Sequence, residues 1–273
     1  MKIALLQMTS GIDPQANART IVDAVAEAAA GGAVMLFTPE MSGLIDQNRA
    51  RARPHLRAEG DDLVLAATRA AAKEHKLWVH LGSLAVQGDD GRLANRAFVI
   101  DDHGEIRARY DKLHLFDVDL PSGESWRESA SYAPGKGAVV VDTPAGQLGL
   151  AICYDLRFAD LFRALSNAGA TVLAIPAAFT RPTGAAHWHI LQRARAIESE
   201  AYVVSAAQTG THEDGRATYG HSLVIDPWGT VLLDMGEEAG LGFAEIDPGR
   251  IADVRARVPV ITHRRAIPDV TSA

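Results

Sequence analysis

The sequence predicts an α/β protein built as a four-layer α-β-β-α sandwich, in which two sheets pack face to face under outer helices. Short apolar runs of strand length alternate with segments of helical period along the whole chain. The two halves also repeat the same order of elements. The chain has 273 residues, of which 47% are hydrophobic and 22% charged, so it is large and apolar enough to bury such a core.

The first half is predicted to begin with a β-α-β unit and to end in a hairpin. Its strands are expected at residues 3–6, 34–37, 77–81, 97–100 and 106–110. Its helices are expected at residues 16–30 and 61–75, the second opened by two aspartates that suit a helix start. The turn of the hairpin is Asp102-His103-Gly104.

The second half is predicted to follow the same order. Its strands are expected at residues 148–153, 171–175, 202–206, 222–225 and 231–233, and its helices at residues 158–168 and 185–200. Val-Ile-Asp occurs at residues 99–101 and 224–226, and the apolar triplets at 77–79 and 202–204 have the same offset of 125 residues. Since no low-complexity linker interrupts the chain, we expect residues 1–273 to form one domain with two pseudo-repeated halves.

Composition excludes several classes of protein. With 27 Lys and Arg against 34 Asp and Glu, the net charge is −7, which gives no general field for nucleic acid. The single cysteine, Cys153, excludes an intrachain disulfide and a Cys-rich zinc cage, and suits a reducing compartment. The apolar run at residues 3–6 is too short for a signal-peptide core, and the longest uncharged run, at residues 164–180, falls short of a membrane span. We therefore expect a soluble, cytoplasmic protein that binds neither nucleic acid nor membrane.

Cys153 is the first candidate for chemistry. It ends the predicted strand at 148–153 and precedes residues 154–158, where a helix is expected to begin. A cysteine at the amino end of a helix lies near the positive end of the helix dipole, which favours the nucleophilic thiolate. An inert buried thiol is the alternative, because free cysteine is among the most buried residue types.

Two charged residues supply the chemical context that Cys153 needs. Glu40 lies just past the apolar run at 34–37, where α/β sheets tend to place sites, and a partly desolvated carboxylate there suits a general base. Lys112 likewise follows a predicted strand, and its ammonium suits stabilisation of an oxyanion. Taken alone, each is equally compatible with a solvated surface charge.

Three segments that contain these residues match a known family. Residues 37–41 (FTPEM), 110–114 (YDKLH) and 152–158 (ICYDLRF), in this order, resemble the signature segments of the nitrilase (carbon–nitrogen hydrolase) superfamily. The resemblance covers nearly the whole chain and implies the same α-β-β-α fold, with no metal and no cofactor.

The resemblance also implies a role for each residue. Cys153 corresponds to the nucleophile, Glu40 to the general base and Lys112 to the group that stabilises the tetrahedral intermediate, together with the backbone N–H of Tyr154. Glu128 falls where the family has a second glutamate, which orients the lysine and the substrate nitrogen, although Glu124 is close by. The implied reaction is hydrolysis of a small amide through a thioester.

A narrower resemblance concerns the branch. Residues 183–188, 193–198, 206–212, 219–222 and 263–265 are similar to the Nit-type amidases, and within them to those that hydrolyse deaminated glutathione to 2-oxoglutarate and cysteinylglycine. One departure is Ala159-Asp160, where family members often have Pro-Glu. An ω-amidase acting on 2-oxoglutaramate, or an N-carbamoyl amino acid hydrolase, remains as an alternative.

An anionic substrate requires cations in a protein of net charge −7. The candidates for substrate binding lie in or beside the signature segments, and they are Arg157, Phe179, Thr180, Arg181 and His187.

The sequence leaves three other classes of protein open. A Cys-His hydrolase would use His114, His187 or His221 as its base. A metal site at His187 and His189 is disfavoured. Side chains two positions apart on a helix point about 200° away from each other, so the two rings cannot easily share one ion. A binding module with an inert Cys153 is the third class. The resemblance also implies a homodimer or larger homo-oligomer, with residues 258–267 crossing to a partner.

Overall fold

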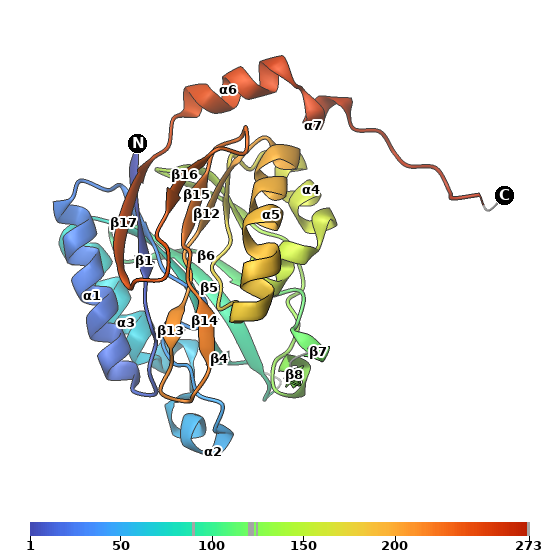
Figure 1. The fold of residues 1–273 in the computed structure, drawn as a ribbon. Helices are drawn as coiled ribbons and strands as arrows, with labels where there is room; N and C mark the ends of the chain where they lie inside the picture. Colours follow the sequence, from blue (N-terminus) through green and yellow to red (C-terminus); the bar gives the residue numbers. More distant parts are fainter. Residues whose placement is uncertain (89–90, 120–122, 124, 272–273) are drawn as a thin grey trace.

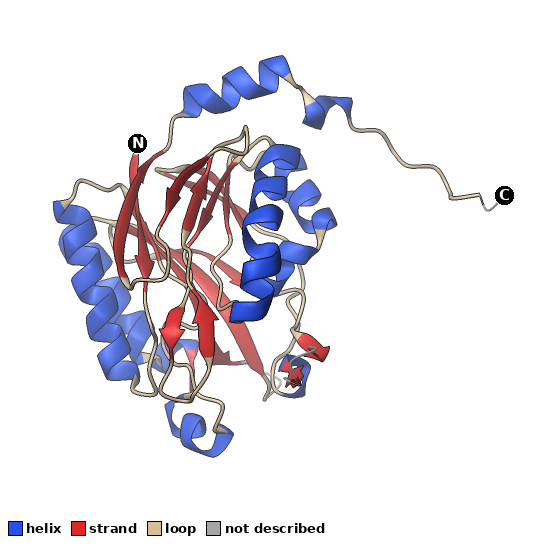
Figure 2. Ribbon diagram, in the orientation of Figure 1, coloured by secondary structure: helices blue, strands red, loops and turns tan. Residues whose placement is uncertain are grey.

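Two β-sheets lie face to face in a computed structural model of the protein, which describes residues 1–88, 91–119, 123 and 125–271. Helices cover the outer face of each sheet, so that the order of layers is α-β-β-α (Figures 1 and 2). This is the predicted fold class.

The first sheet has the strand order β17-β1-β2-β4-β5-β6, with the short β3 (Arg57–Ala58) paired to β4. Its strands are β1 (Lys2–Gln7), β2 (Met35–Phe37), β4 (Trp78–Gln87), β5 (Leu93–Ile100), β6 (Ile106–Asp111) and β17 (Gly240–Glu245). The central strands β1, β2 and β4 are parallel, whereas β17, β5 and β6 pair antiparallel to their neighbours.

The second sheet has the order β16-β15-β12-β11-β10-β9. Its strands are β9 (Val140–Thr143), β10 (Gly146–Leu150), β11 (Val172–Ala174), β12 (Tyr202–Ser205), β15 (Leu223–Ile225) and β16 (Val231–Asp234). Three central parallel strands again have one antiparallel strand on one side and two on the other. The two sheets therefore share one sequence of strand directions.

Four helices form the outer layers. α1 (Pro14–Ala30) and α3 (Leu63–His75) cover the first sheet, and α4 (Ala159–Asn167) and α5 (Arg181–Ser199) cover the second (Figure 1). Asp13 and Asp62 cap α1 and α3, since each carboxylate accepts a hydrogen bond from a backbone N–H of the first turn. The shorter helices are α2 (Arg49–Ala52), α6 (Pro248–Arg257) and α7 (Val260–His263).

Alternation along β1 shows where the core lies. Ile3 and Leu5 belong to the buried cluster between the two sheets, whereas Ala4 and Leu6 belong to a second cluster with residues of α1 such as Ile21. Because successive strand residues point to opposite faces, one strand contributes to both apolar layers. The central second-sheet strands β11 and β12 are buried on both faces, as expected for strands covered by sheet and helix.

The structure corrects one predicted junction. The strand expected over residues 148–153 ends at Leu150, and Cys153 opens a five-residue 3₁₀ turn, η4 (Cys153–Arg157), before α4 begins at Ala159. Sequence analysis also did not predict the edge strands β9 and β17 or the hairpins β7 (Asp117–Asp119) with β8 (Ser125–Arg127) and β13 (Thr209–Thr211) with β14 (Ala217–Tyr219).

The C-terminal segment leaves the sandwich after α6 and α7 and extends away from the body (Figure 1). Arg264 holds its start against α4 and α5, because the guanidinium donates to Ser166 Oγ at 2.8 Å and to the Glu198 carbonyl at 2.7 Å. Among the described residues, no helix combines the length and the apolar character that crossing a bilayer requires.

Candidate active site

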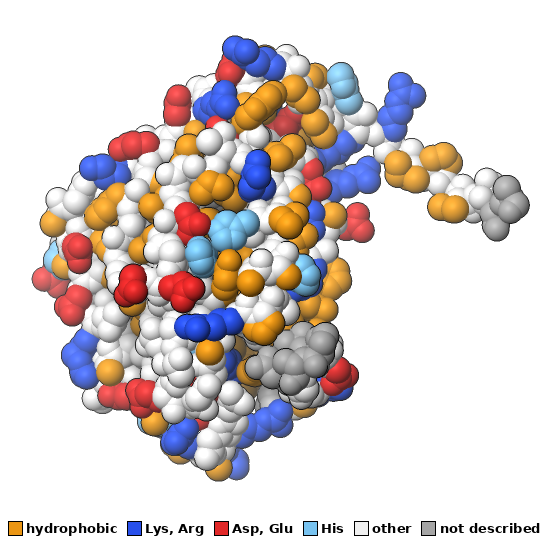
Figure 3. Space-filling model, viewed as in Figure 1, with side chains coloured by type: hydrophobic (Ala, Val, Ile, Leu, Met, Phe, Trp, Pro, Cys, Tyr) orange, Lys and Arg blue, Asp and Glu red, His pale blue; other side chains and the backbone are white. Residues whose placement is uncertain are grey.

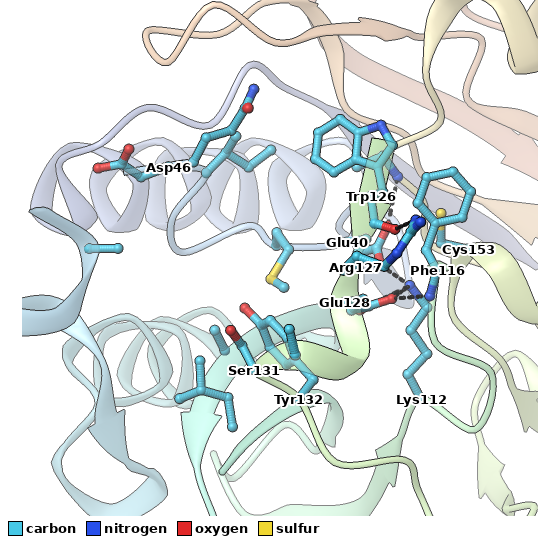
Figure 4. A pocket seen from close by; sticks show the side chains of 18 of the residues that line it. Glu40, Asp46, Lys112, Phe116, Trp126, Arg127, Glu128, Ser131, Tyr132 and Cys153 are labelled. Atoms are coloured by element: carbon cyan, nitrogen blue, oxygen red, sulfur yellow. Dashed lines mark hydrogen bonds and ion pairs between the residues drawn. The ribbon is translucent and has the colours of Figure 1, made fainter. Parts of the chain in front are cut away.

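Three loops bring the predicted catalytic residues together. Glu40 follows β2, Lys112 follows β6 directly, and Cys153 follows β10, so that each lies past the carboxyl end of a strand. Glu128 opens a short 3₁₀ turn, η3 (Glu128–Ala130), after β8. Figure 4 shows the four side chains next to one another at one end of a pocket.

Lys112 lies between the two glutamates. Its Nζ is 2.9 Å from Glu40 Oε1 and 2.9 Å from Glu128 Oε2, and its side chain is only 2% exposed. Glu128 also accepts a hydrogen bond of 2.7 Å from the Phe116 N–H. Each carboxylate therefore holds the ammonium from one side, which fixes the position of its positive charge.

Asn95 on β5 joins the same cluster and was missed by sequence analysis. Its Nδ2 donates to Glu40 Oε1 at 2.9 Å and to Glu128 Oε1 at 3.1 Å, while its own Oδ1 is buried without a partner among the described residues. Glu40 is further fixed by the Ala178 N–H, which donates to Oε2 at 3.0 Å. An asparagine inside a strand gave no local signal for this contact.

The Cys153 loop is tightly anchored. Cys153 has a left-handed φ of 49°, and its N–H donates to the Pro176 carbonyl at 2.9 Å. The buried Asp155 carboxylate accepts hydrogen bonds from the Ile152 N–H, the Tyr110 hydroxyl and the His114 N–H, at 2.9, 2.7 and 3.0 Å. These contacts hold a strained turn that presents the thiol to the pocket.

The backbone N–H of Tyr154 is available to a ligand. It makes no hydrogen bond to another described residue, whereas the N–H groups of both neighbours, Cys153 and Asp155, are bound to carbonyls. An unoccupied N–H directly after a nucleophile is a suitable donor to an oxyanion.

Electrostatics within the cluster favour Glu40 as a carboxylate and Lys112 as an ammonium. Burial alone would raise the pKa of Glu40, but the Lys112 charge and hydrogen bonds from Cys153, Lys112 and Asn95 lower that pKa below its usual 4.5. Burial alone would lower the pKa of Lys112, but the charges of Glu128 and Glu40 raise it well above its usual range.

The thiol environment corrects the prediction that a helix dipole favours thiolate at Cys153. Burial, followed by the negative charge of Glu40, raises the pKa of Cys153 well above its usual 9.0, and the interaction of the thiol proton with the Glu40 carboxylate raises it further. The dipole argument fails because a 3₁₀ turn separates Cys153 from α4, which begins only at Ala159. The resting state is thus a neutral thiol next to a carboxylate.

The pocket that contains these groups has a volume of about 850 Å³. Of the residues predicted to act on substrate, those that line it are Glu40, Lys112, Glu128, Cys153, Tyr154, Arg157, Phe179 and Thr180. Arg181 and His187 are not among its lining residues. Arg181 instead lies 3.8 Å from Glu237, and the exposed His187 contacts Arg157. Glu124, the competing acid, lies outside the described residues.

Arg157 forms one cationic wall near the nucleophile. Its guanidinium lies 5.8 Å from the Tyr154 ring centroid and 5.4 Å from that of Phe179, and Nη1 is 3.2 Å from His187 Nδ1. No carboxylate of the described residues pairs with it. The charge of Arg157 is therefore available for an anion in the pocket.

The pocket continues past these residues to an outer end that sequence analysis did not predict. Figure 4 shows Trp126 and Tyr132 on opposite sides of the space that leads from the catalytic cluster toward Asp46. Five arginines also line the outer part, and they are Arg49, Arg53, Arg92, Arg127 and Arg216. They come from separate loops, so only the fold brings them together.

The histidines weighed as alternatives lie elsewhere. None of His114, His187 and His221 is among the described residues that line the pocket. His114 stacks on Phe158, with 3.6 Å between ring centroids. His189 and His221 both hydrogen-bond to Asp234, at 3.0 and 2.8 Å, in a partly exposed group (Figure 3 shows histidines beside acidic side chains on this face). These bonds connect α5 to β16, and His187 does not share a site with His189.

Comparisons with known proteins agree with the fold. A family model described as carbon-nitrogen hydrolase matches residues 2–256. The chain is 42% identical over 268 residues to the deaminated glutathione amidase of Homo sapiens, covering 96% of this chain and 82% of that protein.

Solved structures are similar as well. The crystal structure of the C. elegans NitFhit protein matches with a TM-score of 0.89 at 39% identity, covering 97% of this chain and 65% of that one. An amidase from Nesterenkonia sp. AN1, solved with acrylamide added at its active-site cysteine, matches with a TM-score of 0.78 at 30% identity, covering 95% and 98%.

Proposed function

This chain belongs to the carbon–nitrogen hydrolase family and is a hydrolase of non-peptide carbon–nitrogen bonds, and we propose that Cys153 is its nucleophile in the hydrolysis of a small carboxylated amide. The observation that supports this most is the contact set at one end of the pocket. There a buried ammonium, Lys112, lies 2.9 Å from the carboxylates of Glu40 and Glu128, and all three line the same pocket as the Cys153 thiol.

The first half of the reaction forms a thioester. Glu40 accepts the thiol proton while the sulfur attacks the amide carbonyl, because the shifted pKa values make a free thiolate unfavourable before attack. The oxyanion that forms accepts hydrogen bonds from Lys112 and the Tyr154 N–H. Both donors are in place before the reaction, so little reorganisation opposes it.

Collapse of the tetrahedral intermediate then expels the amine. Glu40 returns the proton to the leaving nitrogen, and the acyl group stays on Cys153 as a thioester. Glu128 acts as a positioning residue, since it holds Lys112 at 2.9 Å and is available to the substrate nitrogen. A water molecule activated by Glu40 hydrolyses the thioester, which restores the thiol and releases a carboxylic acid.

The similarity to deaminated glutathione amidases supports deaminated glutathione as the substrate, with 2-oxoglutarate and cysteinylglycine as products. Arg157, next to Phe179 and Thr180 in the pocket, is the proposed partner of the carboxylate on the acyl part. The alternatives are an ω-amidase acting on 2-oxoglutaramate and an N-carbamoyl amino acid hydrolase.

The test compares the parent enzyme with Cys153→Ala on four compounds. These are deaminated glutathione, 2-oxoglutaramate, an N-carbamoyl amino acid and a simple nitrile. Hydrolysis is measured as the release of 2-oxoglutarate or ammonia. Cys153→Ala is expected to lose activity, whereas His221→Gln, which removes a histidine outside the pocket, keeps it. Equal rates for the parent and Cys153→Ala would rule out this mechanism. The order of the parent's rates on the four compounds identifies the preferred substrate.

We also propose that residues 1–273 act as one domain in a cytoplasmic homodimer or larger homo-oligomer. Apolar side chains that support an interface are exposed on and beside α5, including Ile190 at 71%, Ile197 at 46% and Trp228 at 53%. The segment 258–267 lies on the same side and is proposed to cross to a partner. Light scattering tests this, and a strict monomer at working concentration would exclude it.

A further inference from the structure

We propose that the outer end of the pocket, centred on Arg216 over Trp126, binds a carboxylate on the amine portion of the substrate. The enzyme would then recognise one anion on each side of the scissile amide, with Arg157 on the acyl side. This inference rests on the proposed amide hydrolysis at Cys153 and specifies which amides that site accepts.

Arg216 combines a fixed position with a charge that its own partners neutralise poorly. Its guanidinium lies 4.6 Å from the Trp126 ring centroid, and its side chain is 20% exposed. Its Nε is buried and has no hydrogen-bond partner among the described residues, and the same holds for Trp126 Nε1. Two stacked side chains that both line the pocket thus each keep one donor that the described residues do not satisfy.

The only carboxylate paired with Arg216 in the described chain is already shared. Asp214 Oδ2 lies 3.5 Å from Arg216 Nη2 and accepts a shorter hydrogen bond of 2.9 Å from the Gln47 N–H. Asp214 Oδ1 accepts from the Arg216 N–H at 3.0 Å. The guanidinium therefore keeps donors for a ligand carboxylate.

Arg49 and Arg53 add positive charge to the same end. Both line the pocket from α2 and the turn after it, and neither makes a hydrogen bond or ion pair with the described residues through its guanidinium. They differ from Arg127, whose Nη2 is held by both oxygens of Asp119 at 2.9 Å. An anion that enters this end meets cations before any unpaired carboxylate.

The size of the pocket fits a substrate with two parts. A volume of about 850 Å³ falls in the upper part of the usual range for small-molecule sites, about 300–1,000 Å³. A two-residue amine such as cysteinylglycine extends roughly 7 Å from the scissile nitrogen, at about 3.3–3.6 Å per residue. An amide that releases ammonia places nothing there. The outer end is thus the part of the pocket that distinguishes these two kinds of amide.

The experiment measures kcat/KM for two substrates with the same acyl group, deaminated glutathione and 2-oxoglutaramate. Arg216→Gln is expected to lower kcat/KM for deaminated glutathione by about 10- to 100-fold, mainly through KM, because one charge-assisted contact is lost. Hydrolysis of 2-oxoglutaramate is expected to change less than about twofold on the same grounds, since ammonia makes no contact at the outer end. Arg216→Lys should restore part of the loss.

Two controls make the result decisive. Arg57→Gln removes the same charge from an exposed arginine outside the pocket lining and should leave both substrates unaffected. A deaminated glutathione with a carboxamide at its C-terminus should be a poor substrate for the parent and no worse for Arg216→Gln. The parent's rates on the acid and on the carboxamide can be compared even if Arg216→Gln folds poorly.

Equal losses on both substrates for a folded Arg216→Gln would overturn the assignment, and so would full activity of the parent on the carboxamide. If the parent hydrolyses neither substrate, the result would instead contradict the proposed function.

Discussion

Replacing Lys112 by Met removes the ammonium that lies between the buried carboxylate of Glu40 and the largely buried carboxylate of Glu128. The side chains of Lys112, Glu40 and Glu128 are 2%, 6% and 12% exposed, so little solvent can replace the lost charge. Removing one partner of a buried ion pair costs about 3–5 kcal/mol of unfolding free energy, because an uncompensated charge stays buried. We expect a loss of this size for Lys112→Met at pH 7, together with loss of activity.

The loss should depend on pH with a definite sign. In the parent, the pKa of Glu40 is lowered in the folded state, so its contribution is present above the usual value of 4.5 and is lost as pH falls through the lowered pKa. Without Lys112, burial raises that pKa above the unfolded value, so the fold loses stability as pH rises through it. The deficit of Lys112→Met is therefore largest at neutral pH and shrinks toward pH 4.5.

Urea unfolding at pH 7 and pH 5, followed by tryptophan fluorescence, measures this difference. The double variant Lys112→Met/Glu40→Gln removes one of the two repelling charges and should recover part of the stability lost at pH 7. The reasoning is refuted if the deficit of Lys112→Met is below about 1 kcal/mol at pH 7, the range of an exposed pair, or if it is the same at both pH values.

Three further predictions concern activity and the nucleophile loop. Because the lowered pKa keeps Glu40 ionised, kcat/KM should fall on the acid side only below pH 4.5, and an acid limb above that value in a pH–rate profile would contradict this. Arg157→Gln should raise KM about tenfold for deaminated glutathione and 2-oxoglutaramate alike, since both share the acyl carboxylate. Steady-state kinetics measures this, and a raised KM for only one of the two substrates would contradict the prediction. Asp155→Asn should lower the unfolding free energy by about 2–4 kcal/mol, because one amide cannot replace a buried carboxylate that accepts several hydrogen bonds; an unchanged urea midpoint would argue against this anchor.

The layers could be predicted from sequence because both sheets are built from apolar strands with clear helical segments between them. β11 and β12 are completely buried, and such runs are visible in the sequence without any knowledge of pairing. β17 is different. It is an edge strand with two glycines and mostly exposed or half-exposed residues, and it pairs with β1 from the opposite end of the chain. Nothing local predicts that partner.

The candidate site shows the same division. The signature segments contain Glu40, Lys112 and Cys153 and predict the type of chemistry, but the direction of the Cys153 pKa depends on burial and on Glu40, which only the fold brings close. Arg216 illustrates the limit more strongly. It belongs to a turn between two short strands, and its importance arises from Trp126, which lies in another hairpin.

The central claim is that Cys153 carries the acyl group during turnover. Since the chain has a single cysteine, intact-protein and peptide mass spectrometry after an acid quench tests this without ambiguity. With excess deaminated glutathione, the account predicts a 2-oxoglutaryl adduct on the peptide that contains Cys153, sensitive to hydroxylamine as a thioester is, and absent from Cys153→Ala. Steady hydrolysis by the parent with no adduct at Cys153, combined with undiminished hydrolysis by Cys153→Ala, would contradict it.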